Sequence, residues 1–157
     1  MLTPAQLQTL KAAIAADPVL SLLPKTPDGA FDVAAALNLD ASPAFYVWRT
    51  QYTPEQMRAA ILNGITQLDA LTASKRDSLL WFSQGAVDCS KAVTQAAIND
   101  LCGSQATLKA AVLDGGKRPA TRAEKIFATG TGTLATPAML VFEGELSYPE
   151  VQAAWAS

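Results

Sequence analysis

The chain has 157 residues, of which half are hydrophobic and 17% are charged, and its formal net charge is −2. This length and apolar content suit one folded domain with a real core, and they argue against a largely disordered chain. The small negative charge argues against a general nucleic-acid binder, which needs a dense basic surface. Because there is no histidine, Ser–His and Cys–His nucleophile pairs and histidine-containing zinc sites are excluded. We expect no catalytic residues, no metal site and no cofactor.

The N-terminal third of the chain predicts two helices and one extended segment. Thr3 is placed to cap a first helix over residues 4–16, which opens with a proline in the position that suits it. A turn is predicted at 24–29, where prolines flank an Asp-Gly pair, and a shorter helix over 31–37. The aromatic and β-branched run 44–48 favours extended structure.

Four further helices are predicted in the middle of the chain, each opened by a capping residue and closed by a glycine or a turn. They cover residues 54–68, 72–84, 90–102 and 104–113. The first of them carries apolar side chains at the four- and three-residue spacing of a core-facing stripe: Met57, Ile61, Ile65 and Leu68. The large aromatic residues are also predicted to lie in the core: Trp48, Trp81 and Trp155, with Phe45 and Phe82.

The two cysteines and the first residues of the chain indicate the cellular compartment in which the protein is expected. Cys89 and Cys102 are the only cysteines. A single helix between them would hold them ~20 Å apart, at ~1.5 Å per residue, beyond disulfide reach. Two free thiols favour a reducing compartment such as the cytoplasm. No signal peptide is expected, because no basic segment precedes an apolar one at the chain start. The longest uncharged stretch, 126–142, is shorter than the ~20 apolar residues of a membrane helix, so no membrane contact is expected.

The pattern changes near the C-terminus. Thr121 opens a short helix with a capping box. The Thr/Gly alternation of residues 129–133 then disfavours a helix and suits an extended arm. Residues 139–142 predict a strand, and Ser147 caps a final helix.

The chain is therefore predicted to be mainly α-helical. A single domain, 1–157, would consist of a helical-bundle body, 1–128 and 146–157, with one β-hairpin or extended arm near the C-terminus, 129–145. An isolated two-stranded ribbon is not stable in water, so the arm should pack on the helices or pair with another molecule. The candidate interface residues lie in this arm: Thr129, Gly130, Thr131, Gly132, Thr133, Met139, Leu140, Val141 and Phe142.

The chain contains one local group of basic residues: Lys117, Arg118, Arg122 and Lys125. The last three would share one face if the segment were helical. A solvated helix start is the ordinary interpretation, and contact with a nucleic-acid backbone or an acidic partner surface is the functional one. Glu143 and Glu145 would share a face of an extended segment, where a solvated strand end is expected rather than a catalytic carboxylate pair.

Several long strings resemble a family of small tailed-bacteriophage proteins. These strings are KRPATRAEKIFATGTGT at 117–133, TPA at 136–138 and VFEGELSY at 141–148, together with SPAF at 42–45 and VWRT at 47–50. The resemblance spans most of the chain and is densest at 117–151.

The resemblance implies a structural protein of the virion. The size and the layout of a helical body with an arm are similar to head–tail connector adaptors, which form a ring, commonly twelve-fold, below the portal. Implied partners are further copies of the chain, the portal protein and other neck or tail proteins, with non-specific contact to packaged DNA. The implied location is the virion neck, after synthesis in the host cytoplasm. Alternatives are another neck, tail-completion or capsid-associated protein, or a small phage DNA-binding regulator.

Overall fold

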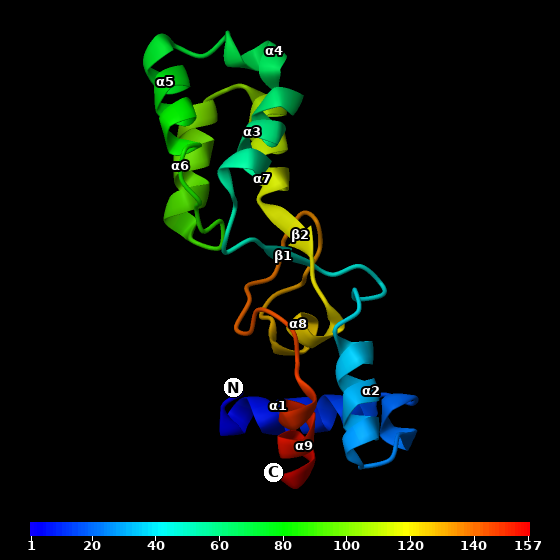
Figure 1. Cartoon of the computed structure of the whole chain (residues 1–157). Coiled ribbons are helices and arrows are strands. Elements are labelled where there is room, and N and C mark those ends of the chain that lie inside the picture. Colours follow the sequence, from blue (N-terminus) through cyan, green and yellow to red (C-terminus); the bar gives the residue numbers. More distant parts are fainter. The chain divides into compact units, whose positions relative to one another are not determined.

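The structure, a computed structural model, describes all 157 residues and is mainly helical, as the sequence predicts (Figure 1). The residues predicted to form one domain divide into two compact units. The first unit contains residues 1–45 and 119–157, and the second contains residues 46–118. No helix is both long and apolar enough to cross a membrane.

The first unit is built from helices at both ends of the chain. These are α1 (Pro4–Ala16), the short 3-10 helix η1 (Leu20–Leu22), α2 (Pro27–Leu37), α8 (Arg122–Phe127) and α9 (Tyr148–Ala156). Helix α9 packs against α1 and α2, and α8 packs against the same two helices. Their apolar faces form one core, in which Leu10, Val33 and Val151 are fully buried.

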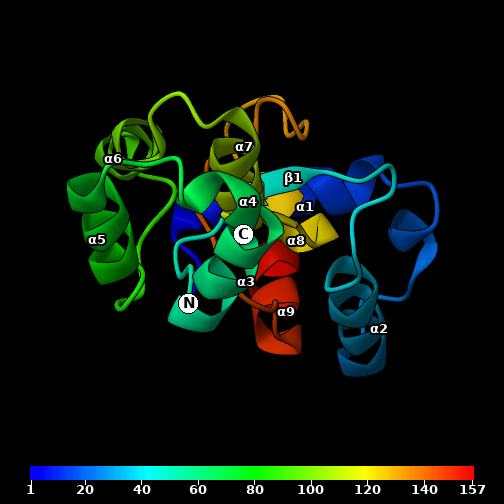
Figure 2. The same cartoon turned by 90° about the horizontal axis from the view of Figure 1, so that it is seen from above.

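The second unit is built from five helices and a short sheet. The helices are α3 (Pro54–Asn63), α4 (Ile65–Leu68), α5 (Ala73–Phe82), α6 (Ala92–Cys102) and α7 (Ala106–Gly115). Helices α5 and α6 lie side by side in Figures 1 and 2, and α7 packs against both α3 and α6. The strands β1 (Tyr46–Trp48) and β2 (Lys117–Pro119) form an antiparallel pair, flanked by a hydrogen bond of 2.9 Å from the Arg49 N–H to the Gly116 carbonyl.

Four helix starts are set by local capping boxes, as predicted, but the helix predicted over 31–37 begins earlier, at Pro27 within the predicted turn, because Thr26 caps it by accepting from the Gly29 N–H. At Thr3, Thr53 and Thr121 the cap hydroxyl accepts from the backbone N–H three residues on, and the Gln or Glu there accepts from the N–H of the cap residue. At Ser147 the Glu150 carboxylate accepts from the Ser147 N–H at 3.0 Å. These reciprocal bonds satisfy N–H groups that a helix leaves without partners at its start.

Three predictions from the sequence are wrong in the second unit. The helix predicted over 54–68 is broken at Gly64, a poor helix former. The four apolar side chains of the predicted stripe therefore do not all face the core: Ile65 is 45% exposed, while Leu68 is buried. Trp81 is 73% exposed rather than in the core. Trp81 lies two positions after the buried Leu79 in α5, and residues two apart point to different faces of a helix. The helical period, and not the size of the side chain, therefore decides which of the two is buried.

The two cysteines are free and buried in the core of the second unit, which confirms the prediction of free thiols. Cys89 precedes α6 and Cys102 is its last residue, so the helix between them is shorter than predicted. Burial raises the pKa of the Cys89 thiol to about 11, and burial also raises the pKa of Cys102. Both side chains therefore act as small apolar core residues at neutral pH.

Candidate functional site

The segment 129–145, called the C-terminal loop below, is an extended loop closed by one bridge. The Thr129 N–H donates to the Met139 carbonyl and the Met139 N–H donates to the Thr129 carbonyl, both at 2.9 Å. Ala138, next to the bridge, is fully buried. The strand predicted over 139–142 does not form. A Thr/Gly segment offers few side chains for cross-strand pairing, so the ladder stops after one pair.

Threonine hydroxyls hold the far end of the C-terminal loop. The Thr131 hydroxyl donates to the Thr136 carbonyl at 3.0 Å. The Thr136 N–H donates to the Thr133 hydroxyl, also at 3.0 Å, and the hydroxyls of these two residues lie 2.7 Å apart. The hydroxyls of Thr131 and Thr133, two of the predicted interface residues, therefore form hydrogen bonds within the loop.

Gly132 fits the loop against the ring of Phe45. Its φ is +65°, a backbone conformation that side chains other than glycine rarely adopt. A Cβ at this position would lie 2.0 Å from Phe45 Cε2, so the backbone passes directly over the ring. The Lys125 amino group lies 5.6 Å from the centroid of the same ring, within cation–π range. The loop is therefore packed on its own unit near this ring.

The returning half of the C-terminal loop is also attached to the first unit. Phe142 packs against Phe127, with ring centroids 5.2 Å apart. Asn38 accepts from the Leu146 N–H at 2.8 Å and donates to the Leu146 carbonyl at 2.9 Å. Buried Glu124 accepts from the Gly144 N–H at 3.4 Å. Nothing in the sequence marks Asn38 as a partner of a residue 108 positions away.

Part of the loop faces solvent with apolar side chains. Val141 is 63% exposed, Leu134 is 49% exposed and Met139 is 42% exposed. Leu140 is half-buried, and Thr129, Thr131 and Thr133 are exposed. Of the predicted interface residues, Gly132 and Phe142 face their own unit instead. Leu134 was missed because a single leucine inside a turn carries no periodic signal.

The basic residues of the predicted cluster do not share one helix. Lys117 and Arg118 lie in β2, and only Arg122 and Lys125 lie in α8, so the predicted face with Arg118 is wrong. Lys117 pairs with Asp114 at 2.7 Å, and its amino group lies 5.5 Å from the centroid of the Trp48 ring. Pro119 lies between Lys117 and Arg118 on one side and Arg122 and Lys125 on the other. The residue before a proline disfavours the helical conformation, so one helix cannot include both pairs.

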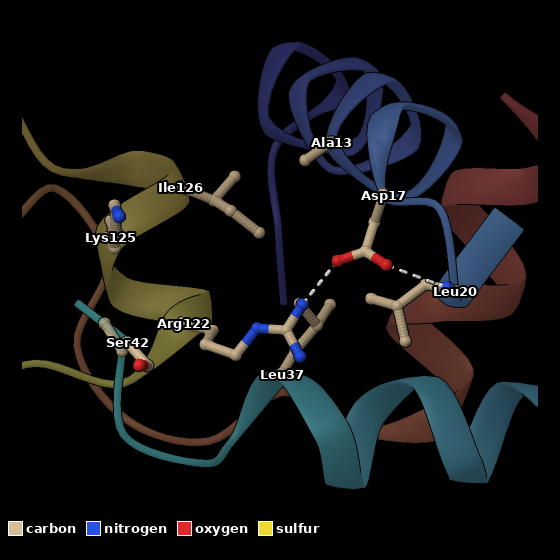
Figure 3. A pocket seen from close by; sticks show the side chains of 9 residues that line it. Ala13, Asp17, Leu20, Leu37, Ser42, Arg122, Lys125 and Ile126 are labelled. Carbon is tan, nitrogen blue, oxygen red and sulfur yellow. Dashed lines mark hydrogen bonds and ion pairs between the residues drawn. The ribbon is translucent and has the colours of Figure 1, made fainter.

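Arg122 is used mainly inside the first unit. Its Nη2 lies 2.5 Å from Asp17 Oδ2 (Figure 3), and its Nη1 donates to the Ala36 carbonyl at 3.4 Å. The second Asp17 oxygen accepts from the N–H groups of Leu20 and Val19, each at 2.9 Å. The hydrogen bonds from Leu20 and Val19, and then the charge of Arg122, lower the pKa of Asp17 below 3.8. This ion pair joins the end of α1 to α8.

The ion pair forms one wall of a pocket of about 360 Å³, called the Arg122 pocket below (Figure 3). Its residues come from α1, η1, α2, α8 and the segment after α2: Ala13, Asp17, Leu20, Leu37, Ala41, Ser42, Arg122, Lys125 and Ile126. Aliphatic and polar side chains share the walls, and Figure 3 shows the Arg122 guanidinium next to the Asp17 carboxylate, with Ser42 and Lys125 farther from that carboxylate. Sequence reasoning found Arg122 and Lys125 but not Asp17 or Ser42, which become neighbours only through folding.

No family model, curated protein or solved structure matches this chain. The resemblance of residues 117–151 to tailed-phage proteins stays a prediction. What the chain does is therefore inferred from the C-terminal loop.

Proposed function

We propose that the chain is a structural subunit of a tailed-phage particle and that the C-terminal loop is its contact with neighbouring subunits. One observation carries the proposal: the loop presents exposed Leu134, Met139 and Val141 while its base and its return are held on the first unit. The resemblance of the surrounding strings to phage proteins gives the class of particle.

The energetics of the loop suit a contact surface. Burying one large apolar side chain contributes ~1.5–3 kcal/mol, so three such side chains on one loop can stabilise an interface substantially. The bridge at Thr129 and the threonine hydrogen bonds already order the loop. A loop that is ordered before binding loses less conformational entropy when the partner docks.

The proposed assembly is a ring. When one surface of each copy contacts a different surface of the next, the contact is head-to-tail and closes into a ring if the rotation allows. A head–tail connector adaptor, placed below the portal in the virion neck, is the specific role proposed. The neighbours would then be copies of the chain, commonly twelve in such rings, with the portal protein and other neck or tail proteins.

The test removes the exposed apolar side chains without changing the loop backbone. In a Leu134→Gln, Met139→Gln and Val141→Thr variant, we expect oligomers in analytical ultracentrifugation and incorporation into particles to be lost. A matched control changes three exposed apolar residues elsewhere: Leu22→Gln, Leu62→Gln and Val93→Thr. Circular dichroism should show the same helix content in both variants.

Two outcomes would contradict the proposal. Normal particle incorporation of the loop variant would show that these side chains carry no contact. A purified wild-type chain that stays monomeric, is absent from particles and shifts DNA in a gel at moderate salt would favour the DNA-binding regulator instead.

A further inference from the structure

We propose that the surface around Trp81 on the second unit receives the C-terminal loop of the next copy of the chain. The inference rests on the proposed function and deepens it, because it names the surface that the loop contacts in the neighbouring subunit. The loop belongs to the first unit and Trp81 belongs to the second. A contact between two different surfaces is head-to-tail, which is the kind of contact that closes into a ring.

Trp81 is exposed although it is one of the largest apolar side chains of the chain. It lies near the end of α5, where Leu79 is fully buried while Trp81 is 73% exposed. Leu80, between them, is 42% exposed. Tryptophan is enriched at the hot spots of protein interfaces, where the partner buries its ring. The exposed ring therefore marks a place where docking would remove a large apolar area from water.

Trp81 borders a pocket of about 460 Å³, called the Trp81 groove below. Its other lining residues are Phe82, Gln84, Gly85 and Val87, so no charged side chain lines it. Space is open beside Gly85, where an added Cβ would meet no atom within 4 Å. The groove therefore offers mostly apolar walls and free room for side chains of a partner.

Backbone and hydroxyl hydrogen bonds order the Trp81 groove before any partner binds. The backbone of Val87 forms two hydrogen bonds with that of the buried Tyr52, at 2.9 and 3.1 Å. The hydroxyl of buried Ser83 donates to the Leu80 carbonyl at 2.8 Å. Because these bonds hold the segment after α5, docking on it costs little conformational entropy.

The uncharged Trp81 groove matches the uncharged C-terminal loop. Residues 126–142, which include the exposed Leu134, Met139 and Val141, contain no charged side chain. Covering the groove with this loop therefore removes no ionised group from water, which is the costly step when a charged surface is covered. Exposed apolar side chains of both surfaces leave water together, and this drives the contact.

Three other pockets of the chain suit the loop less well, because charged side chains line each of them. The Arg122 pocket contains the ion pair of Asp17 with Arg122, and also Lys125. The charged residues of the other two pockets are Glu143, Glu145 and Glu150 in one and Lys11 and Lys25 in the other. The loop would take water from these groups without offering them an opposite charge. The Trp81 groove is therefore the occupant's better match.

The first test uses two substitutions in the Trp81 groove. Trp81→Gln removes the exposed ring, and Gly85→Glu places a carboxylate in the open space of the groove. Both positions are exposed and Gly85 has no positive φ, so circular dichroism should show unchanged helix content. In analytical ultracentrifugation of the full chain, we expect each substitution to weaken self-association about 30-fold, the loss typical of an interfacial hot spot.

The matched controls change Leu62, an exposed apolar residue of α3 in the same unit that does not line the Trp81 groove. Leu62→Gln matches the loss of apolar surface in Trp81→Gln, and Leu62→Glu matches the added charge in Gly85→Glu. We expect both controls to associate as the wild type does.

A mixing experiment identifies the occupant of the groove. The variant with Leu134→Gln, Met139→Gln and Val141→Thr keeps its groove, and the Gly85→Glu variant keeps its loop, so one intact contact can form between them. At a concentration at which the wild-type chain associates, we expect each variant alone to sediment as a monomer. An equal mixture should form dimers that do not grow further, because a head-to-tail assembly needs both surfaces on every copy.

Two results would overturn the inference while the proposed function stands. Wild-type association of both Trp81→Gln and Gly85→Glu, with association lost in the loop variant, would place the loop on another surface. A mixture that stays monomeric would show that the loop of one copy does not meet the groove of another. Failure of the proposed function is distinguishable and overturns the inference as well, because the wild-type chain itself would then be monomeric and absent from particles.

Discussion

The two units of the chain differ in how far apart in sequence their packed segments lie. The second unit is one continuous stretch, and its core consists of apolar side chains, two thiols and the ring of Tyr52. The first unit combines both ends of the chain. There, polar contacts join segments far apart in sequence: Asp17 with Arg122, and Asn38 with Leu146.

Chain connectivity explains this difference. Bringing distant segments together costs loop-closure entropy that neighbouring helices do not lose. Apolar contacts offset that cost but are not directional. Ion pairs and paired hydrogen bonds have fixed geometry, so they also decide which distant segments meet and in which register. The continuous unit uses such contacts over shorter separations: the Gln67 side-chain oxygen accepts from the N–H groups of Thr107 and Leu108, and Arg49 Nε donates to the Gly115 carbonyl, 66 positions away.

The largest expected effect comes from truncating one fully buried leucine in each unit. Leu10→Ala in the first unit and Leu108→Ala in the second should each lower the free energy of unfolding by about 2–5 kcal/mol. Hydrogen exchange should show that each substitution lowers protection mainly in the helices of its own unit. Equal loss of protection throughout the chain after either substitution would mean that the two units unfold as one.

The packing of the C-terminal loop on Phe45 predicts the next effect. Gly132→Ala should destabilise the first unit by about 2 kcal/mol, because it adds backbone strain and a clash with the ring. Gly144→Ala is the control, since Gly144 also has positive φ but has open space around its Cα. Thermal unfolding should show the larger loss for Gly132→Ala. Equal losses would mean that the loop does not pack on Phe45.

A gain in stability is expected in the second unit. The Tyr52 hydroxyl is buried and has no hydrogen-bond partner, and burial raises the pKa of this hydroxyl. Tyr52→Phe removes the unpaired group and keeps the ring, so it should stabilise the chain by about 1 kcal/mol in urea unfolding. A clear loss of stability would show that the hydroxyl has a partner in solution.

The smallest expected effect is the acid sensitivity of the first unit. Folding lowers the pKa of Asp17 from its usual 3.8, so near that pH Asp17 carries fewer protons on average in the folded state than in the unfolded state. The stability from this group is present above about pH 3.8 and is lost as the pH falls further through the folded pKa. Asp17→Asn should reduce the slope of stability against pH below 3.8, measured by urea unfolding. An unchanged slope would mean that Asp17 is not ionised in the ion pair.

The sequence predicted the local features well. The capping boxes at Thr3, Thr53 and Thr121 form as expected, since each involves residues only three positions apart. The extended segment near Val47 forms β1, and the cysteines are free. The predictions failed where a periodic pattern was assumed to continue along the chain or a strand needed a pairing partner. The stripe ending at Leu68 crosses the break at Gly64, and the strand over 139–142 found no ladder.

The sequence by itself determined where the helices with capping boxes begin and which segment forms an extended loop, because capping bonds and glycine conformations act within a few residues. Only the tertiary structure decided that the chain divides into two units and that Arg122 pairs with Asp17, 105 positions away. The same holds for Gly132, which passes over the ring of Phe45. These contacts depend on how distant segments meet, and hydrophobic periodicity contains no information about the partner. The loop surface and the Arg122 pocket both arise from such contacts.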